Sequence, residues 1–280
     1  MPIAIKSLSG ISTLAVAAIF NEAFSDYIVP LKLTEQQMAD KIKSENIQLD
    51  KSVGVFEEEK LVGFILIGID TVNGVSLAYN AGTGVIPSYW GNQFTQKIYA
   101  YLLPALQQDG IVHHQLEVIT TNTKAFAVYE KIGFSIARKL TCFKGTITGC
   151  QSLSGIIIEQ ADENCMNSDF WDSEPTWQNS MNAIKRDAAN HLFFSATSNN
   201  IPVGYLVYTP LSGRVKQFAV DKKYRNRGIG QAMFHYLHQQ IDGKDISIIN
   251  VDDADASTIN FLKKIGLATT VFQYEMKKLF

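Results

Sequence analysis

The two halves of this chain repeat one order of strand-like and helix-like segments, and this repeat restricts the possible folds most. In the first half, apolar runs at 53–56 and 61–66 flank a polar turn, which predicts a β-hairpin. In the second half, apolar runs at 192–196 and 203–207 flank Ser-Asn-Asn in the same way. Each second strand opens with Val-Gly-aromatic. The repeat therefore predicts two tandem units built to one plan.

The segments that follow each hairpin also correspond. We expect helices near 92–107 and 228–241, followed by apolar strands at 115–119 and 246–251. Asp-Gly follows each of these helices, and glycine is a common helix stop. A second helix then ends before Gly133-Phe134 or Gly266-Leu267, and a last strand follows. This alternation predicts a mixed α/β sheet in each half.

The length of 280 residues is comfortable for two domains. Small and polar residues cluster at 146–154. We therefore expect one domain over residues 1–148 and a second over residues 154–280.

Composition excludes several classes of protein. A net charge of −2 argues against a general nucleic-acid binder. The three cysteines have no Cys-x-x-Cys spacing, which argues against a zinc site and fits a reducing, cytoplasmic compartment. No apolar run reaches the ~18 residues that would span a bilayer. The moderately apolar stretch 11–20 could mimic a signal peptide, but serines dilute it, and we interpret it as a helix.

The segment Arg225–Gly230 predicts a phosphate site. It lies between a strand-like run at 215–220 and a helix-like run at 231–238. Glycines at a strand-to-helix turn let several backbone N–H groups and the helix dipole meet an anion. A dinucleotide fingerprint would need a glycine where Met233 stands, and no Gly-Lys-Ser/Thr triplet of a P-loop follows Gly228. The alternative interpretation is a tight turn without a ligand.

The spacing Arg-x-x-Gly-x-Gly after a strand resembles the acetyl-CoA loop of the GCN5-related N-acetyltransferase (GNAT) family. The segment 122–134 is similar to that family's pattern Asn-x-x-Ala-x-x-x-Tyr-x-x-x-Gly-Phe. The resemblance covers nearly the whole chain and implies two tandem acyl-CoA N-acyltransferase folds.

The resemblance implies acetyl-CoA as co-substrate, no metal, and direct transfer to an amine. A backbone N–H of the fourth strand would stabilise the oxyanion. Phe218 and Val220 would offer backbone bonds to the pantetheine arm. The loop contacts expected for acetyl-CoA are Arg225, Asn226, Arg227, Gly228, Ile229, Gly230 and Gln231.

The second half lacks the family's tyrosine, which commonly protonates the departing thiolate. Leu262 stands at that position, and Asp255 stands at the asparagine position. Tyr274, His235 or water are candidate donors by type only, although His235 also suits the surface of an amphipathic helix.

The first half keeps Tyr129 and Asn122 but alters the loop. Trp90 replaces the basic residue, and Gln93 and Thr95 replace the two glycines. Loss of the arginine removes a charge-assisted bond worth roughly 1.5–3 kcal/mol. Tyr129 is the candidate catalytic residue, and a packed structural tyrosine is the alternative.

Several carboxylates and aromatic residues could have either a functional or a structural role. Glu117 and Asp70 are candidate bases. Asp252, Asp253 and Asp255 could bind a cationic amine, but we favour helix caps for this group. The aromatic residues that could form walls of an acceptor pocket are Tyr27, Trp171 and Trp177.

We therefore expect an acetyl-CoA-dependent N-acetyltransferase that acts on a primary amine of a small molecule or peptide. Nucleic acid and membrane are not expected partners, and a monomer is compatible with two fused units. One alternative is a non-catalytic CoA-binding or assembly module. In another, one half shapes the acceptor pocket of the other.

Overall fold

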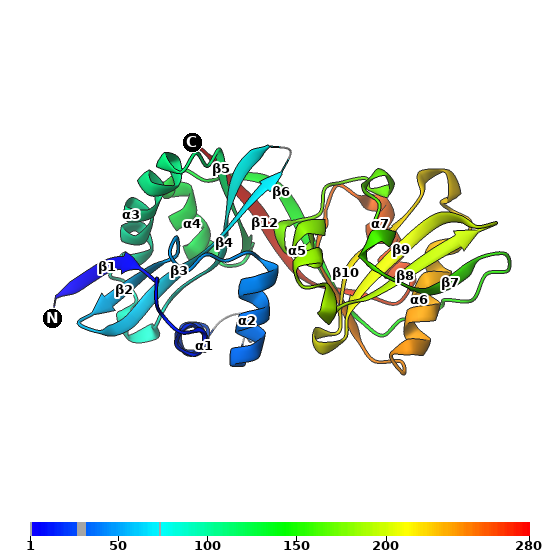
Figure 1. The fold of residues 1–280 in the computed structure, drawn as a ribbon, viewed down its shortest axis with the longest axis horizontal. Helices are drawn as coiled ribbons and strands as arrows, with labels where there is room; N and C mark the ends of the chain where they lie inside the picture. Colours follow the sequence, from blue (N-terminus) through cyan, green and yellow to red (C-terminus); the bar gives the residue numbers. More distant parts are fainter. Residues whose placement is uncertain (1, 27–31, 73) are drawn as a thin grey trace. The chain divides into compact units, whose positions relative to one another are not determined.

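The computed structural model describes residues 2–26, 32–72 and 74–280, which form two compact units. Unit 1 comprises residues 1–137 and 274–280, and unit 2 comprises residues 138–273 (Figure 1). This division differs from the expected one at 148–154, because the last strand of each half contributes residues to the other unit.

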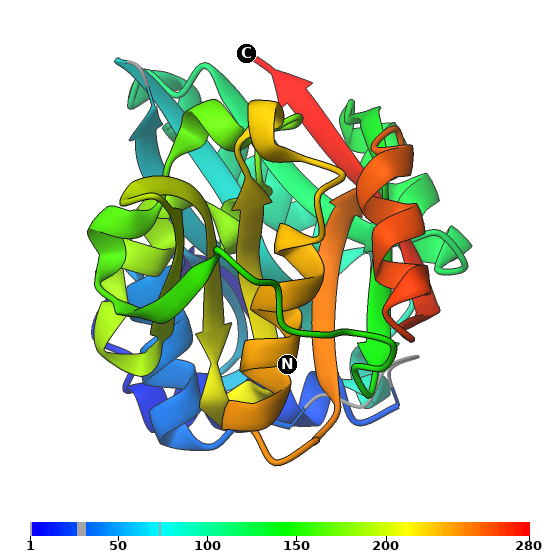
Figure 2. The ribbon, with the colours of Figure 1, turned by 90° about the vertical axis from the view of Figure 1, so that its right-hand side faces the viewer.

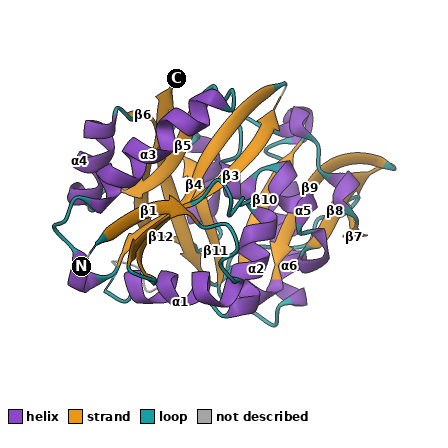
Figure 3. Ribbon diagram, turned by 60° about the vertical axis from the view of Figure 1, so that its left-hand side comes forward, coloured by secondary structure: helices purple, strands orange, loops and turns teal. Residues whose placement is uncertain are grey.

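Unit 1 is a sheet with two pairs of helices. Its strands follow the order β1-β2-β3-β4-β5-β12, and α1 packs beside α2 as α3 packs beside α4 (Figure 3). The elements are β1 (Ile3–Ser7), α1 (Thr13–Ala23), α2 (Glu35–Ser44), β2 (Val53–Glu57), β3 (Lys60–Val72), β4 (Val75–Val85), α3 (Phe94–Gln108), β5 (His113–Ile119), α4 (Thr123–Ile132) and the end of β12 (Ala268–Leu279).

Unit 2 has the strand order β6-β11-β10-β9-β8-β7, with α6 packed against strands β7 to β10 (Figure 2). Its elements are most of β6 (Ser135–Gly145), β7 (Ile157–Ala161), α5 (Met181–Arg186), β8 (Leu192–Ser198), β9 (Ile201–Thr209), β10 (Arg214–Val220), α6 (Ile229–Gln240), β11 (Ile246–Asp252) and α7 (Ala256–Lys264). Short 3-10 turns at Ser168–Phe170 and Trp177–Asn179 precede α5.

The apolar stretch near the N-terminus belongs to the core of unit 1. Ser12 caps α1 by accepting a hydrogen bond from Ala15 N. The helix buries Val16 and Phe20 and packs against β3 and β4. The apolar residues of this segment therefore have a folding role, as the helical interpretation expects.

Strands β10 and β11 of unit 2 diverge after a single parallel pair. Arg214 pairs with Ser247, and no further pair of these strands follows among the described residues. The antiparallel pairing of β10 with β9 continues to Val220, after a bulge between Val215 and Gln217. A bulge increases the local twist. The far half of β10 is therefore paired on one edge and open on the other.

Unit 1 has the same arrangement at its fourth and fifth strands. β4 pairs with β5 over Leu77–Tyr79 and then diverges, while its pairing with β3 runs on to Val85 past a bulge opposite Leu66/Ile67. The predicted sequence repeat is thus a repeat of the fold, including the split between two parallel strands.

Candidate functional site

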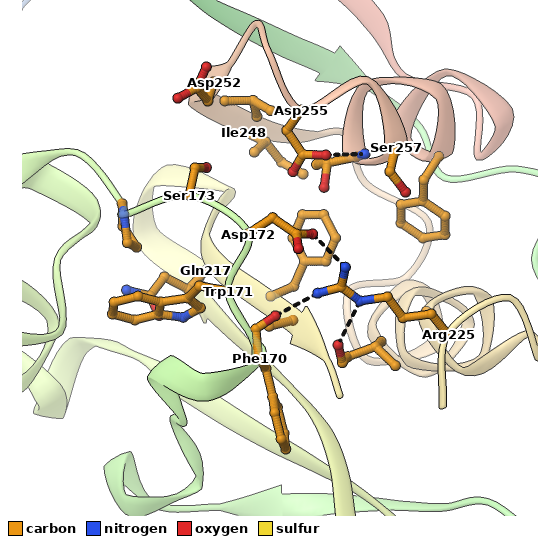
Figure 4. Close-up of a pocket in the computed structure, with 18 of the residues that line it drawn as sticks. Phe170, Trp171, Asp172, Ser173, Gln217, Arg225, Ile248, Asp252, Asp255 and Ser257 are labelled. Carbon is orange, nitrogen blue, oxygen red and sulfur yellow. Dashed lines mark hydrogen bonds and ion pairs between the residues drawn. The ribbon is translucent and has the colours of Figure 1, made fainter. Parts of the chain in front are cut away.

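A cavity of about 590 Å³ lies in unit 2 at the split between β10 and β11. The far half of β10, the start of α6, the start of α7 and the loop 170–175 all contribute to its lining. Figure 4 shows Arg225 directed toward Asp172, with Asp255 and Ser257 from the start of α7 above them. The predicted phosphate loop therefore lines a cavity of the size range of small-molecule sites.

The start of α6 provides an anion-binding end to this cavity. Gly228 is the N-cap residue, with φ 88° and ψ −2°, and no described side chain caps the helix. The first N–H groups of a helix have no intrahelical partner, and the helix dipole makes that end positive. The structure thus offers backbone donors at the predicted loop, and glycine suits the left-handed conformation of residue 228.

Gly230 meets a packing requirement. A Cβ at this position would lie 3.1 Å from the ring of Phe261 on α7. That ring packs against Phe218 and Phe234, with centroid distances of 5.8 and 5.5 Å. The second glycine of the loop therefore lets α6 approach the aromatic floor beneath the cavity.

The backbone of Phe218 and Val220 faces the open edge of β10. Asp221 N donates to Val203 O across the β9 pairing at 2.9 Å. Backbone groups alternate in direction along a strand, so those of residues 218 and 220 point away from β9 and toward the split. This orientation fits the predicted contacts to an extended ligand arm.

The Arg225 side chain forms hydrogen bonds and an ion pair with other residues of unit 2. Its Nε donates to Val220 O at 3.0 Å, its Nη1 pairs with Asp172 Oδ2 at 2.5 Å, and its Nη2 donates to Phe170 O at 2.7 Å (Figure 4). The guanidinium therefore joins the end of β10 to the loop that lines the opposite wall.

The other side chains of the loop point in several directions. Arg227 stacks over the Tyr224 ring at 5.4 Å and is exposed. Ile229 is buried in the core, and Gln231 Nε2 lies 3.4 Å from Gly149 O. Asn226 has φ 59° and is exposed. Of these side chains, Arg227 is the exposed cation closest in sequence to the helix start.

The altered loop of unit 1 keeps the backbone geometry of the intact one. Gln93 is the N-cap of α3 and has φ 58°, as Gly228 has a positive φ at the N-cap of α6. Trp90 Nε1 donates to Val85 O at 2.7 Å, over the same five-residue separation as the Arg225–Val220 bond. The predicted correspondence of Trp90 with Arg225 therefore has a structural counterpart.

Tyr129 lies in the interior of unit 1, 9 % exposed. Its hydroxyl is 3.5 Å from Asn80 Nδ2, and its ring packs edge-on against Tyr99 and Phe134. Asn80 Nδ2 also donates to the Tyr99 hydroxyl at 2.9 Å. Burial raises the pKa of Tyr99 well above its ordinary value. Tyr129 thus belongs to a buried polar network beside the split of β4 and β5, and its catalytic role stays a prediction.

The donors considered for unit 2 lie elsewhere. Leu262 is fully buried in the core. Tyr274 belongs to unit 1, where its ring contacts Phe126. His235 is on α6 and does not contribute to the cavity lining. Of the proton donors that the sequence suggests for unit 2, water is the one that remains a candidate.

The aspartates after β11 act as caps and ion-pair partners. Asp255 Oδ1 accepts from Thr258 N at 3.0 Å at the start of α7, as Asn122 caps α4. Asp252 Oδ1 accepts from Ala254 N at 3.0 Å, and its Oδ2 lies 3.2 Å from Arg138 Nη1. Asp253 accepts from the Thr141 hydroxyl at 2.8 Å. Of the three, Asp255 is the helix cap that we favoured, whereas Asp252 and Asp253 are held by a turn, an arginine and a threonine.

Glu117 is placed in the split of unit 1. The Tyr79 hydroxyl donates to its Oε2 at 2.5 Å, while its Oε1 is buried with no described partner. Burial raises the pKa of Glu117 to about 8, against the lowering effect of the Tyr79 bond. A carboxyl group in this state can hold or accept a proton near neutral pH.

The acceptor-wall predictions meet different outcomes. Trp171 lines the cavity and donates from Nε1 to the Tyr205 hydroxyl at 2.5 Å. Trp177 is buried and does not contribute to the lining. Tyr27 lies outside the described residues.

Sequence reasoning missed the polar bridge across the split. The Tyr205 hydroxyl donates to Gln217 Oε1 at 2.9 Å, and Gln217 Nε2 donates to Asn179 O at 2.5 Å. Asn179 Nδ2 then donates to Ile249 O on β11 at 2.9 Å. No motif signals these residues, because Asn179 comes from a short turn far from both strands in sequence.

Across the described ranges, no cluster of histidine, cysteine, aspartate or glutamate has the arrangement of a metal site. Within the same residues, no helix is both long and apolar enough to cross a membrane.

Comparison with known proteins defines the family to which this chain belongs. The model of the acetyltransferase (GNAT) family matches residues 15–134 and 159–267, once in each half. The chain therefore belongs to the GNAT family, as a tandem member, which confirms the predicted family and fold class. Membership supports N-acetyltransferase activity in general. No curated protein sequence matches the chain.

Solved structures resemble both halves together. A GCN5-related N-acetyltransferase from Sphaerobacter thermophilus is 14 % identical with a TM-score of 0.74, over 99 % of this chain and 95 % of that one. A tandem GNAT protein from the clavulanic acid biosynthesis pathway, solved without AcCoA, is 10 % identical with a TM-score of 0.73, over 99 % and 98 %. A putative acetyltransferase from Pyrococcus horikoshii is 12 % identical with a TM-score of 0.71, over 99 % and 89 %. At these identities the likeness is one of fold.

Proposed function

We propose that this protein transfers an acetyl group from acetyl-CoA directly to a primary amine of a small molecule or peptide, with both substrates bound together. Unit 2 supplies the acetyl-CoA site, made by the backbone of the loop Arg225–Gln231 and the open edge of β10. The observation that carries the proposal is the start of α6. Its N-cap residue, Gly228, has φ 88°, and no described side chain caps the helix. An uncapped helix start beside a split sheet suits a pyrophosphate and an extended pantetheine arm.

The chemistry follows from this placement. A neutral amine attacks the thioester carbonyl carbon, the carbon–sulfur bond breaks, and the thiolate takes up a proton while the amine loses one. The N–H groups of Phe218 and Val220 face the split, where one of them would meet the oxyanion. For transfer in unit 2, water is our candidate proton donor; if unit 1 binds acetyl-CoA as well, Tyr129 is our proposed proton donor there.

Calorimetric titration with acetyl-CoA tests the site. The Gly228→Glu variant introduces a carboxylate where the phosphates would bind, so we expect at least a tenfold loss of affinity. Gly155→Glu is the matched control, because Gly155 also has a positive φ, of 79°, and an added Cβ there meets nothing within 4 Å. Equal affinity of both variants and the wild type would refute the site.

A non-catalytic CoA-binding module is the second candidate function. The fully buried Leu262 at the position of the family's tyrosine favours it. Release of free CoA in the presence of a panel of primary amines separates the two functions. Acetyl-CoA binding without amine-dependent CoA release would support the binding module.

A further inference from the structure

The ion pair between Arg225 and Asp172 joins two parts of the cavity lining. A second hollow is lined by Arg225 and Asp172 together with Ser173, Asp252 and Asp255. The side chains of Arg225 and Asp172 are 27 % and 39 % exposed. The guanidinium charge is thus already matched by a carboxylate before any ligand arrives, which is unexpected for a residue whose consensus position suggests phosphate binding.

The two units share the side-chain bond to the strand end and differ in the bonds to the loop 170–172. Trp90 in unit 1 and Arg225 in unit 2 each donate a ring or guanidine N–H to the last carbonyl of the preceding strand. Tryptophan has one such donor and no charge, whereas arginine has further N–H groups. The bond to the strand end is therefore common to both loops. The Nη bonds to Phe170 and Asp172 are the part that unit 2 adds.

Both added bonds end in the loop 170–172, which forms one wall of the cavity. On its other side this loop is fixed by the bond from Trp171 Nε1 to the Tyr205 hydroxyl. Residues 171–175, which include this tryptophan, have no regular secondary structure. Without the arginine contacts, this wall would be held by the Trp171 bond, by the bond from Arg138 Nη1 to Glu174 O at 2.8 Å and by the packing of Phe170 against Tyr205.

Other groups in unit 2 can supply the charge that a pyrophosphate needs. Lys222, Lys223 and Arg227 are exposed and belong to the same turn. Among the described residues, none of these three has an acidic partner within ion-pair distance. None of the three lines the cavity itself, but together with the backbone donors of α6 they offer positive charge beside it that does not come from Arg225.

We propose that Arg225 is a positioning residue for the acceptor: through Asp172 and Phe170 it holds the loop 170–172 in the shape that receives the amine substrate, and it contributes little to acetyl-CoA affinity. The inference rests on the proposed function for its amine acceptor, but the link between Arg225 and the loop 170–172 can be measured without any acceptor.

Two variants separate this role from phosphate binding. Arg225→Trp copies unit 1, keeping a donor for Val220 O while removing both Nη bonds. Asp172→Asn removes the charge of the partner and keeps its shape. We expect each variant to raise hydrogen exchange of segment 168–175 by about fivefold or more, because a partly exposed ion pair and its hydrogen bonds are lost. The double variant should add little, since both changes remove the same link.

Acetyl-CoA affinity, measured by calorimetry, should change by less than about threefold in both variants. Arg227→Ala is the matched control from the same loop, with the opposite pattern expected: about tenfold weaker acetyl-CoA binding and unchanged exchange of segment 168–175.

A kinetic measurement tests the acceptor side, with tyramine, spermidine, glucosamine and a peptide with a free N-terminus as probe amines. For the amine that turns over, Arg225→Trp should raise KM by about fivefold, with kcat within about twofold.

The inference is overturned if Arg225→Trp weakens acetyl-CoA binding tenfold or more, or if exchange of segment 168–175 is unchanged in Asp172→Asn. Failure of the wild type to bind acetyl-CoA would instead refute the proposed function, and the exchange measurements would still decide whether Arg225 holds the loop.

Discussion

At the scale of single residues, the two glycines of the phosphate loop meet different physical requirements. Gly228 has a positive φ, which other residues adopt at a cost of about 1–2 kcal/mol. Gly230 has ordinary helical geometry, but an added Cβ would lie 3.1 Å from the Phe261 ring, closer than ordinary van der Waals contact. The sequence motif shows both glycines alike, and only the structure distinguishes backbone conformation from close packing.

Gly230→Ala should destabilise unit 2 by roughly 1–3 kcal/mol, because the added methyl group must displace Phe261 from its packing on Phe218 and Phe234. Urea unfolding measures the loss. Adding Phe261→Leu should recover part of it by making room, and a fully stable Gly230→Ala protein would contradict the packing role.

Tyr129→Phe tests the proposed proton donor of unit 1. Loss of a general acid typically lowers the rate 10²–10⁴-fold, so we expect kcat to fall by at least about tenfold if unit 1 transfers acetyl groups. Tyr99→Phe is the control, since it removes a hydroxyl from the same network around Asn80. An equal, small effect of both variants would assign Tyr129 to packing.

At this scale the candidate site was only partly predictable. The loop Arg225–Gln231 was located from its spacing, because glycines before a helix carry a direct physical meaning. The partners of the Arg225 guanidinium were not, since Phe170 and Asp172 are distant in sequence and no pattern encodes which carboxylate a charge meets.

At the scale of elements, the predicted order of strands and helices agrees closely with the structure. The helices expected at 92–107 and 228–241 are Phe94–Gln108 and Ile229–Gln240. Apolar periodicity and Asp-Gly stops mark these elements locally. The split of the paired strands was not visible from the residues, because strand divergence and the bulge between Val215 and Gln217 depend on neighbouring strands.

Strand β5 carries a buried carboxyl group whose titration should affect stability. The folded state holds the Glu117 proton up to a pH of about 8, whereas its ordinary pKa is 4.5. Its contribution is therefore most favourable below pH 4.5 and is lost as the pH rises through 8, by up to roughly 1.4 kcal/mol per pH unit.

Glu117→Gln should remove this loss, so the variant should gain stability relative to the wild type between pH 5 and pH 8. Hydrogen exchange of β5 as a function of pH measures the difference within unit 1. Glu130→Gln, at an exposed position on α4, is the control. A constant difference between Glu117→Gln and the wild type across this range would show that the carboxyl group is not buried as described.

At the scale of the whole molecule, the two units are not two consecutive pieces of chain. Residues 274–280 complete unit 1, and residues 138–145 belong to unit 2. The expected boundary at 148–154 followed the composition of the linker. Composition cannot show this exchange, because it marks where a linker lies and not which unit a strand joins.

Separate fragments 1–148 and 154–280 should therefore fold poorly. Each would lack strand residues of its own unit and present a strand that belongs to the other, and unpaired edges favour aggregation. Circular dichroism and size-exclusion chromatography of each fragment, compared with the two mixed, measure the effect. We expect compact, helical protein only from the mixture. A well-folded fragment 1–148 alone would contradict the exchange.

The exchanged strands also determine when the protein can mature during its synthesis. Most of unit 1 precedes unit 2 in the chain, yet unit 1 waits for residues 274–280, which are synthesised after the whole of unit 2. Most domains can fold as soon as they emerge, N-terminal first. Here the N-terminal half must persist in an incomplete state while the second half is translated, which makes its transient exposure to chaperones and proteases longer than that of unit 2.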